Sequence, residues 1–252
     1  MSGTGDIPSV TLFGCRVDRL PMEGVVIRCS EFLREDRPHY VVTADTSAIV
    51  IAQDDEPFRG IINDADLVTP DSIGVVWASK RAGSPVPERV PGVDTMERLC
   101  ELAAKTGDPV YLLGAAPGVA EMAANALCQR FPGLKVSGAR DGFFQPDDEP
   151  DIVRAIAESG ARILFVALGI PKQEKFIARN LASTGVRLAM GVGGSFDCFA
   201  GIVKRAPTIV RNFQLEWLWR TLSNPKKWRK ALTLPQFAFM VLFHHKDTEA
   251  QR

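Results

Sequence analysis

Residues that could carry out transfer chemistry stand directly after short apolar runs of this sequence. They are Thr43, Asp71, Gly114, Asp141, Gln173 and Asp197. A carboxylate can act as a general base, and a hydroxyl or amide can hold a sugar or phosphate group. Ligands of an open α/β sheet bind beyond the carboxyl ends of its strands, against helix N-termini. The spacing therefore predicts a binding site at one edge of such a sheet.

The stretch from Ile163 to Phe176 shows this pattern most clearly. Its apolar run predicts a buried strand that ends at Gly169, and Pro171 then favours the start of a helix, where its missing N–H costs nothing. Gln173 falls in the first turn of that helix, where a ligand would bind. A solvated first-turn residue is an equally good interpretation of Gln173.

Asp71 and the glycine-rich stretches each allow two interpretations. Asp71, after Pro70, could be a general base, but helix-capping aspartates are commoner. The stretch 191–197, which includes Gly193, could bring backbone amides to a diphosphate while Asp197 holds a ribose diol, or it could be an ordinary turn. The stretch 114–118 fits neither GxGxxG nor GxxxxGK[ST], which disfavours NAD and ATP.

Short apolar runs alternate with helical patterns along the first 202 residues. Strands are expected at 10–13, after Gly14, and at 39–43, 66–69, 110–113, 134–139, 163–168 and 186–190. Helices are expected between them, one of them capped by the stretch Thr43 to Thr46, and 83–93 is a Pro/Gly-rich loop. This alternation predicts an α/β fold with a Rossmann-like, mostly parallel sheet flanked by helices. We expect residues 1–202 to form this core and 203–252 a C-terminal helical appendage.

Metal-ligating and redox side chains are sparse. The acidic runs 54–56 and 147–149 lie at expected helix starts, which favours a structural role over metal binding. Two of the three histidines, His244 and His245, lie in the tail, so a histidine-based metal or triad site is disfavoured. The five cysteines are scattered without CxxC, which predicts reduced thiols and no zinc site. No cofactor or metal is expected.

The 252-residue chain has a formal net charge of zero, but the charge is uneven. Residues 1–202 carry 20 basic and 27 acidic side chains, whereas 203–230 carry eight basic residues and one acidic residue, Glu216. The basic residues are Lys204, Arg205, Arg211, Arg220, Lys226, Lys227, Arg229 and Lys230. Tryptophans and the apolar run 234–243 accompany them, which suits a membrane surface better than nucleic acid. We see neither a secretion signal nor a spanning segment, so a cytoplasmic, membrane-peripheral location is expected.

Seven stretches, in order over about residues 10–230, resemble one family. They are Thr43-Ala44-Asp45, Pro70-Asp71-Ser72-Ile73-Gly74-Val75-Val76, Arg89-Val90-Pro91-Gly92, Asp141-Gly142-Phe143-Phe144, Gly169-Ile170-Pro171-Lys172-Gln173-Glu174, Gly191-Val192-Gly193-Gly194-Ser195-Phe196-Asp197, and Arg205-Ala206-Pro207 with Leu215-Glu216-Trp217-Leu218. The sequence is similar to the WecG/TagA/CpsF glycosyltransferases, which transfer N-acetylmannosamine-type sugars in bacterial surface polymer synthesis.

The resemblance implies an inverting, metal-independent transfer from a UDP-sugar to a polyprenyl-diphosphate-linked acceptor. It implies that Asp71 is the general base, that Thr43 and Gln173 position sugar or diphosphate, and that Arg89 neutralises developing charge. It also implies substrate-binding roles for Asp45, Gly114, Asp141, Phe143, Gly169, Gly193 and Asp197. Arg205, Arg211, Arg220, Lys227 and Lys230 would meet the acceptor diphosphate or the membrane.

Three alternatives stay open at this stage. The donor sugar could be N-acetylmannosamine-like, glucose or a uronic acid, because Asp45 stands where the family pattern has Asn. Asp45 and Ser72 also motivate a non-catalytic, nucleotide-sugar-binding assembly subunit. A nucleotide-dependent oxidoreductase is disfavoured by the missing GxGxxG. A homo-oligomer is compatible with the sequence.

Overall fold

The computed structural model describes residues 7–203, 233–243 and 250–251, and the chain divides into two compact units. The first unit takes its described residues from 1–25, 44–91 and 206–252, and the second takes them from 26–43 and 92–205. The predicted division at 202/203 lies next to residues outside the described part and stays a prediction.

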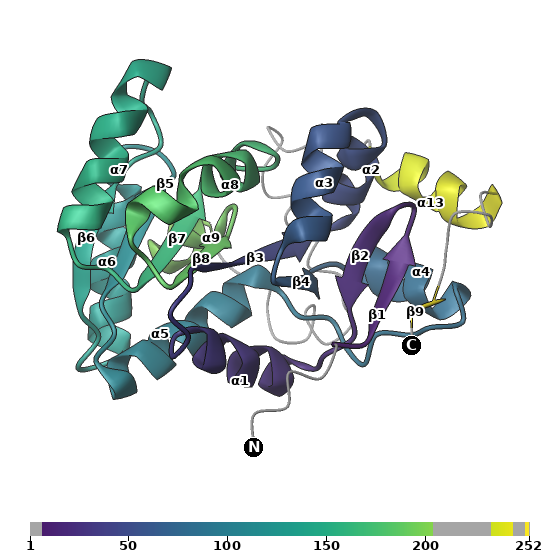
Figure 1. Ribbon diagram of the computed structural model, residues 1–252, viewed down its shortest axis with the longest axis horizontal. Helices are drawn as coiled ribbons and strands as arrows, with labels where there is room; N and C mark the ends of the chain where they lie inside the picture. Colours follow the sequence, from purple (N-terminus) through teal and green to yellow (C-terminus); the bar gives the residue numbers. More distant parts are fainter. Residues whose placement is uncertain (1–6, 204–232, 244–249, 252) are drawn as a thin grey trace. The chain divides into compact units, whose positions relative to one another are not determined.

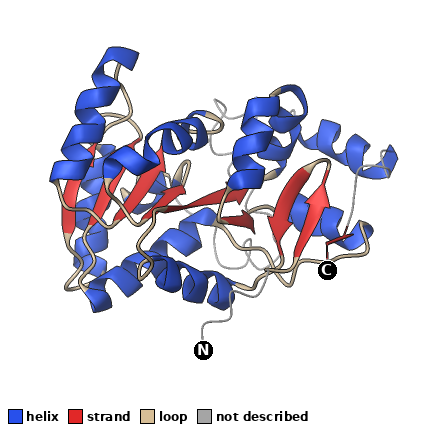
Figure 2. Cartoon of the chain, viewed as in Figure 1, coloured by secondary structure: helices blue, strands red, loops and turns tan. Residues whose placement is uncertain are grey.

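Parallel strands form the centre of the second unit (Figure 2). They are β3 (His39–Ala44), β5 (Val110–Gly114), β6 (Val136–Arg140), β7 (Ile163–Ala167) and β8 (Leu188–Gly191). Within the second unit the strands lie in the order β3-β8-β7-β5-β6, whereas β4 (Leu67–Pro70) and Ala44 belong to the first unit. The β3–β8, β8–β7, β7–β5 and β5–β6 pairs are all parallel. The predicted α/β fold with a mostly parallel sheet is confirmed.

Helices cover both faces of this sheet. They are α5 (Gly92–Thr106), α6 (Val119–Arg130), α7 (Glu149–Glu158), α8 (Lys172–Thr184) and α9 (Ser195–Phe199), and α1 (Met22–Phe32) precedes β3. Leu113, Leu164 and Val166 share a buried cluster with Ile156 of α7 and Phe176 of α8. The chain moves from β5 outward to β6 but returns to β7, so right-handed crossovers place α6 on the opposite face.

The first unit contains a separate antiparallel sheet (Figure 1). Strands β1 (Ser9–Leu12) and β2 (Cys15–Asp18) form a hairpin, and β9 (Ala250–Gln251) pairs with β1. The sequence predicts the two hairpin strands but not their C-terminal neighbour, because a two-residue strand carries no periodic signal. The helices of this unit are α2 (Thr46–Asp54), α3 (Glu56–Asp64), α4 (Ile73–Arg81) and α13 (Thr233–Phe243).

Helix α13 packs against α2 and α4 within the first unit (Figure 1). Its buried residues are Phe237 and Val241. The Phe237 ring meets the Phe13 ring edge to face at 6.0 Å, and the Arg81 Nε donates to the Val241 carbonyl at 3.3 Å. The helical apolar run expected after residue 233 is therefore confirmed, and it is anchored by residues far away in the sequence.

All five cysteines are free thiols. Cys15, Cys29 and Cys100 are buried, whereas Cys128 is exposed. Burial raises the pKa of both Cys15 and Cys29 to about 12, and burial also raises the pKa of Cys100. At neutral pH these three residues are protonated thiols and behave as small apolar side chains.

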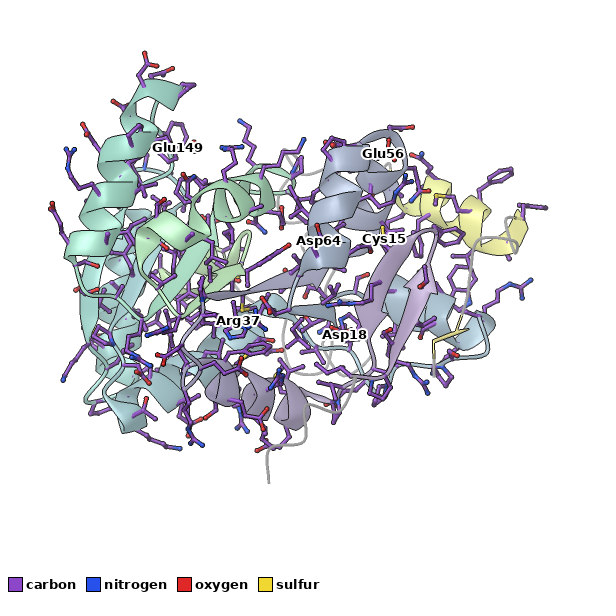
Figure 3. The ribbon with its side chains drawn as sticks, in the orientation of Figure 1. Cys15, Asp18, Arg37, Glu56, Asp64 and Glu149 are labelled. Carbon is purple, nitrogen blue, oxygen red and sulfur yellow. The ribbon has the colours of Figure 1, made fainter. Side chains whose placement is uncertain are left out.

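Asp18 is a buried carboxylate at the end of the hairpin (Figure 3). Its Oδ2 accepts the Val68 N–H at 2.7 Å, and its Oδ1 lies 3.1 Å from the Arg16 Nε. Burial raises the pKa of Asp18 to about 6, although Arg16 and the Val68 N–H act in the opposite direction. Asp18 thus ties β2 to β4, but its ionised form is disfavoured by the surroundings that hold it.

We predict that this carboxylate makes the protein less stable as the pH rises from about 4 to about 7. Because the folded pKa lies above the unfolded one, the folded state binds more protons in this range, and the free energy of unfolding falls. The shift corresponds to roughly 3 kcal/mol, which is lost by the time the pH exceeds the folded pKa. Urea unfolding of Asp18→Asn across this range should lack that component.

Asp36→Asn supplies the matched control, because Asp36 is a fully exposed carboxylate that pairs with Arg187 at the surface. It should keep the wild-type dependence on pH. Identical pH slopes for wild type and Asp18→Asn would contradict the assignment.

Candidate functional site

The topology of the second unit has a switch point between β5 and β7. These strands are neighbours, yet the helices that follow them, α6 and α8, lie on opposite faces of the sheet. Such a switch point is where open α/β sheets bind ligands, outside the carboxyl ends of the strands. Gly114 ends β5, and Gly169 follows β7, so both predicted residues lie at this switch point.

Backbone hydrogen bonds join the chain segments at this switch point. The Ala115 N–H donates to the Ala167 carbonyl at 2.9 Å, and the Gly142 N–H donates to the Ala115 carbonyl at 2.9 Å. The loops after β5, β6 and β7 are thus held in one arrangement. Because these loops are already ordered, their remaining polar groups can bind a ligand with little further loss of conformational entropy.

Gly114 has a structural reason to be glycine. Its φ is +129°, and a Cβ there would lie 2.5 Å from the Ala167 carbonyl carbon. A side chain would therefore collide with backbone in a conformation that L residues rarely adopt. This requirement explains the glycine whether or not a nucleotide contacts it.

Gln173 is 1% exposed and bonded inside the second unit. Its Oε1 accepts the Gly169 N–H at 3.2 Å and the Gly193 N–H at 3.0 Å. Its Nε2 donates to the Glu174 Oε1 at 2.7 Å. The solvated first-turn interpretation is wrong, because the side chain turns inward and joins the loops after β7 and β8.

Thr43 approaches the same loop from β3. Its Oγ1 donates to the Gly191 carbonyl at 3.1 Å, and the side chain is buried. A Cβ on Gly191 would lie 2.6 Å from the Gln173 Nε2. The structure therefore brings Thr43, Gln173, Gly169 and Gly193 together around Gly191.

Asp141 and Phe143 form a tight turn after β6. The Asp141 Oδ1 accepts the Phe143 N–H at 2.8 Å, which fixes the start of the loop. The Phe143 side chain is 76% exposed. An exposed aromatic ring on an ordered turn is suited to stacking against a planar ligand group.

Asp197 lies in α9, downstream of the 191–194 loop. Its carbonyl accepts the Val203 N–H at 3.0 Å, and its side chain is half-buried. Gly193 in that loop has a φ of +53°. The ribose role of Asp197 stays a prediction.

Helix capping in the first unit distinguishes Asp45 from Asp71, which the sequence left ambiguous between a cap and a base. Asp45 caps α2, with its Oδ1 accepting the Ala48 N–H at 2.8 Å. At α4 the cap is Ser72, whose Oγ accepts the Val75 N–H at 3.4 Å. The capping interpretation of Asp71 is therefore wrong, since the next residue performs that task. The Asp71 N–H donates to the Ala44 carbonyl at 3.0 Å, which fixes its backbone beside the end of β3.

Arg89 lies in the Pro/Gly-rich loop, which is ordered. The Ser79 Oγ accepts the Val86 N–H at 3.0 Å, and the Val90 N–H donates to the Pro70 carbonyl at 2.9 Å. Arg89 and Asp71 are the chain neighbours of the two residues in this last bond. The half-buried guanidinium thus belongs to the same part of the first unit as the proposed base.

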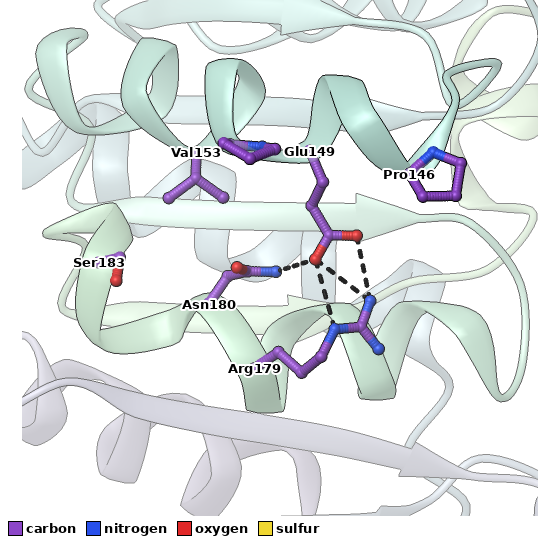
Figure 4. Close-up of a pocket in the computed structure, with 7 residues that line it drawn as sticks. Pro146, Glu149, Val153, Arg179, Asn180 and Ser183 are labelled. Atoms are coloured by element: carbon purple, nitrogen blue, oxygen red, sulfur yellow. Dashed lines mark hydrogen bonds and ion pairs between the residues drawn. The ribbon is translucent and has the colours of Figure 1, made fainter.

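A groove of about 580 Å³ runs between α7 and α8 (Figure 4). It is lined by Pro146, Glu149, Pro150, Val153, Arg179, Asn180 and Ser183. Burial raises the pKa of Glu149, but hydrogen bonds from Asn180 and Arg179 outweigh this effect and leave the pKa below its usual range. Arg179 and Glu149 form an ion pair with each other. None of the predicted site residues lines this groove.

The acidic runs serve helix starts. Asp55 caps α3 by accepting the Phe58 N–H at 3.0 Å, and Asp148 accepts the Gln145 N–H at 2.9 Å ahead of α7. The structural interpretation of both runs is confirmed. Within residues 7–203, 233–243 and 250–251, no three His, Cys, Asp or Glu residues gather in a way that could hold a metal ion.

Glu174 is a buried residue of this region that sequence reasoning did not single out. Its position after Pro171 is that of an ordinary first-turn carboxylate, whereas its burial and its contact with Gln173 distinguish it. The basic candidates Arg205, Arg211, Arg220, Lys227 and Lys230 lie outside the described residues. Across the part of the chain that is described, the helices are too short or too polar to span a membrane.

Comparison with known proteins gives a consistent result over most of the chain. A profile of the Glycosyl transferase WecG/TagA/CpsF family matches residues 10–251. An N-acetylglucosaminyldiphosphoundecaprenol N-acetyl-beta-D-mannosaminyltransferase from Bacillus spizizenii is 35% identical over 215 residues, which cover 85% of this chain and 83% of that protein. Proteins of the same name from Bacillus subtilis and Staphylococcus aureus are each 32% identical, covering 82% and 92% of this chain and 80% and 91% of their own lengths.

The match includes the strand ends and loops at which the candidate residues lie, and it extends through the C-terminal region. The chain is therefore a glycosyltransferase and belongs to the WecG/TagA/CpsF family.

Proposed function

We propose that this glycosyltransferase moves a hexose-type sugar from a UDP-sugar to a polyprenyl-diphosphate-linked acceptor in bacterial cell-surface or exopolysaccharide synthesis. An N-acetylmannosamine-type sugar is the donor of first choice, because the names of the similar proteins specify it. The observation that carries the mechanism is the position of Asp71, which follows β4 while Ser72 takes over the cap of α4.

In this mechanism Asp71 is the general base. An acceptor hydroxyl attacks the anomeric carbon of the donor and gives its proton to the Asp71 carboxylate. The new glycosidic bond forms as the bond from that carbon to UDP breaks, with inversion. A carboxylate suits this role because it is ionised at neutral pH and need only accept one proton per transfer.

The leaving UDP requires stabilisation of its diphosphate. We assign this role to Arg89 and to the cationic residues that the sequence places at 204–230, without a metal ion. On the donor side, Phe143 offers an exposed ring for the nucleobase, and Asp197 offers a carboxylate for a ribose diol.

The Asp71→Asn variant should lose about 10²-fold or more in kcat, because the amide cannot take the proton. The measurement is UDP release with a lipid-diphosphate-sugar acceptor across a panel of UDP-sugars. Ser72→Ala is the matched control. It removes the N-cap of α4, which lowers the free energy of unfolding by about 1 kcal/mol but leaves Asp71 in place. Undiminished turnover of Asp71→Asn would remove Asp71 from the role of base.

A non-catalytic assembly subunit is the competing function. It would bind a UDP-sugar tightly and turn over none of the acceptors in the same panel.

Asp45 offers a test of donor choice. Asn caps helices as well as Asp does, so Asp45→Asn preserves α2 and removes only the negative charge. If this carboxylate lies beside the donor, the variant should raise kcat/KM for a UDP-uronic acid about tenfold relative to a neutral UDP-sugar, since a like-charge repulsion is gone. An unchanged ratio would place Asp45 away from the donor.

We also propose that the enzyme acts at the inner face of the cell membrane, where α13 contributes an apolar surface. Phe239, Leu242 and Phe243 are exposed on this helix, and the rings of Phe239 and Phe243 lie 4.7 Å apart. Phe237 and Val241 hold the opposite side of the helix within the first unit. Lipid-surface binding strengthens with apolar area and with nearby basic residues, which the sequence places just before α13.

Replacing both exposed rings, as Phe239→Ser with Phe243→Ser, should weaken partitioning onto anionic vesicles about tenfold, because less apolar area enters the lipid. Co-sedimentation measures the change. Met122→Ser is the control, since Met122 is an exposed apolar residue on α6 of the other unit. Point variants are preferable to truncation, which would also remove the packing of Phe237. Equal partitioning of the double variant and wild type would exclude α13 from membrane contact.

A further inference from the structure

The Gln173 amide has a defined orientation because each of its ends meets the opposite kind of group. Two N–H donors, of Gly169 and Gly193, point at Oε1, and a carboxylate oxygen of Glu174 faces Nε2. Rotating the amide by 180° would set its NH2 against two donors and its oxygen against a carboxylate. In a buried site each of these mismatches is costly.

Glu174 is available for this contact because of the residue that precedes the helix. A Glu at the third position of a helix ordinarily reaches back to the N–H of the N-cap residue. Here the N-cap is Pro171, which has no N–H. The Glu174 Oε1 instead accepts from the Gln173 Nε2 at 2.7 Å, and both side chains are 1% exposed.

Gly191 lies against the Gln173 side chain and leaves room for its amide. A Cβ there would lie 2.6 Å from Nε2, 3.0 Å from Cδ and 3.1 Å from Cγ of Gln173. The bare glycine lets the amide lie flat against the end of β8, where Thr43 also holds the Gly191 carbonyl. The group is therefore a clamp, composed of Glu174, Gln173 and Gly191, that fixes the loops after β7 and β8 relative to each other.

We propose that Glu174 is a positioning residue for donor binding: it orients the Gln173 amide, which holds the Gly169 and Gly193 loops in the conformation that accepts the nucleotide sugar. The donor part of this statement rests on the function proposed above. The clamp itself rests on three hydrogen bonds within one compact unit.

Hydrogen exchange at individual amides tests the clamp without any substrate. In Glu174→Ala, the Gly169 and Gly193 N–H groups should exchange about tenfold faster or more, because the Gln173 oxygen is no longer held toward them. The Val192 N–H, which bonds the Val166 carbonyl at 2.8 Å, should keep its wild-type rate. Glu174→Gln should restore protection, since its amide oxygen can still accept from Nε2. Wild-type exchange at both glycines in Glu174→Ala would overturn the proposal.

Kinetics separates positioning from a merely structural role. Glu174→Ala should raise KM for the UDP-sugar, and Kd for UDP by calorimetry, about tenfold while kcat changes less than threefold. A structural role alone would lower the melting temperature and the active fraction and leave KM unchanged, and that result would refute the positioning role. Should Glu174→Ala fail to fold, Gly191→Ala displaces the same amide from the opposite side and should give the same exchange and KM changes.

Failure of the proposed function is distinguishable from failure of the clamp. If the wild-type protein neither binds UDP nor releases it from any UDP-sugar, the donor assignment is wrong. The exchange rates at Gly169 and Gly193 then still decide whether Glu174 holds Gln173.

Discussion

A single side-chain oxygen, the Gln173 Oε1, holds together the loops after β7 and β8, where the second unit is expected to bind its substrate. The Gln173 Oε1 accepts two backbone N–H groups from loops that are more than twenty residues apart. A buried N–H that loses its acceptor costs about 1–3 kcal/mol, so both loops are pinned by the same atom. The same side chain leaves no room for a Cβ on Gly191. Glycines in such a site need not contact phosphate to be required.

Several carboxylates in the first unit have defined structural tasks. Asp45 and Asp55 accept hydrogen bonds from N–H groups at helix starts, and Asp18 accepts one from a strand N–H and pairs with an arginine. At α4 a serine performs the capping task, so the aspartate before it is not needed there. The helix requires one acceptor at its start, and a neutral hydroxyl satisfies it. Asp71 is thereby distinguished from its neighbours by local chemistry rather than by its position alone.

The sequence predicts the features that local signals determine. The helix after Pro171 and a cap within the stretch Thr43 to Thr46 are confirmed, because turn and cap chemistry acts over a few residues. The strand before Gly169 is also confirmed, but it ends at Ala167. The burial of Gln173 could not be predicted, since it depends on the Gly193 N–H across a β-strand. The same reason hides the pairing of β1 with β9. The sequence signal for this packing is Gly191, because a glycine at a strand end often marks the close approach of another group.

Helix α13 is apolar on all sides, yet only one of its sides is buried. A helix with apolar residues all round is stable in water only if most of its surface is covered. Phe237 and Val241 are covered by the first unit, yet Phe239, Leu242 and Phe243 remain exposed. Packing side chains from the hairpin and from α4 fix the helix, so it cannot rotate to hide the second face without giving up the first. Under the proposed membrane role, an apolar face held open in this way brings the enzyme to an acceptor that carries its sugar on a lipid.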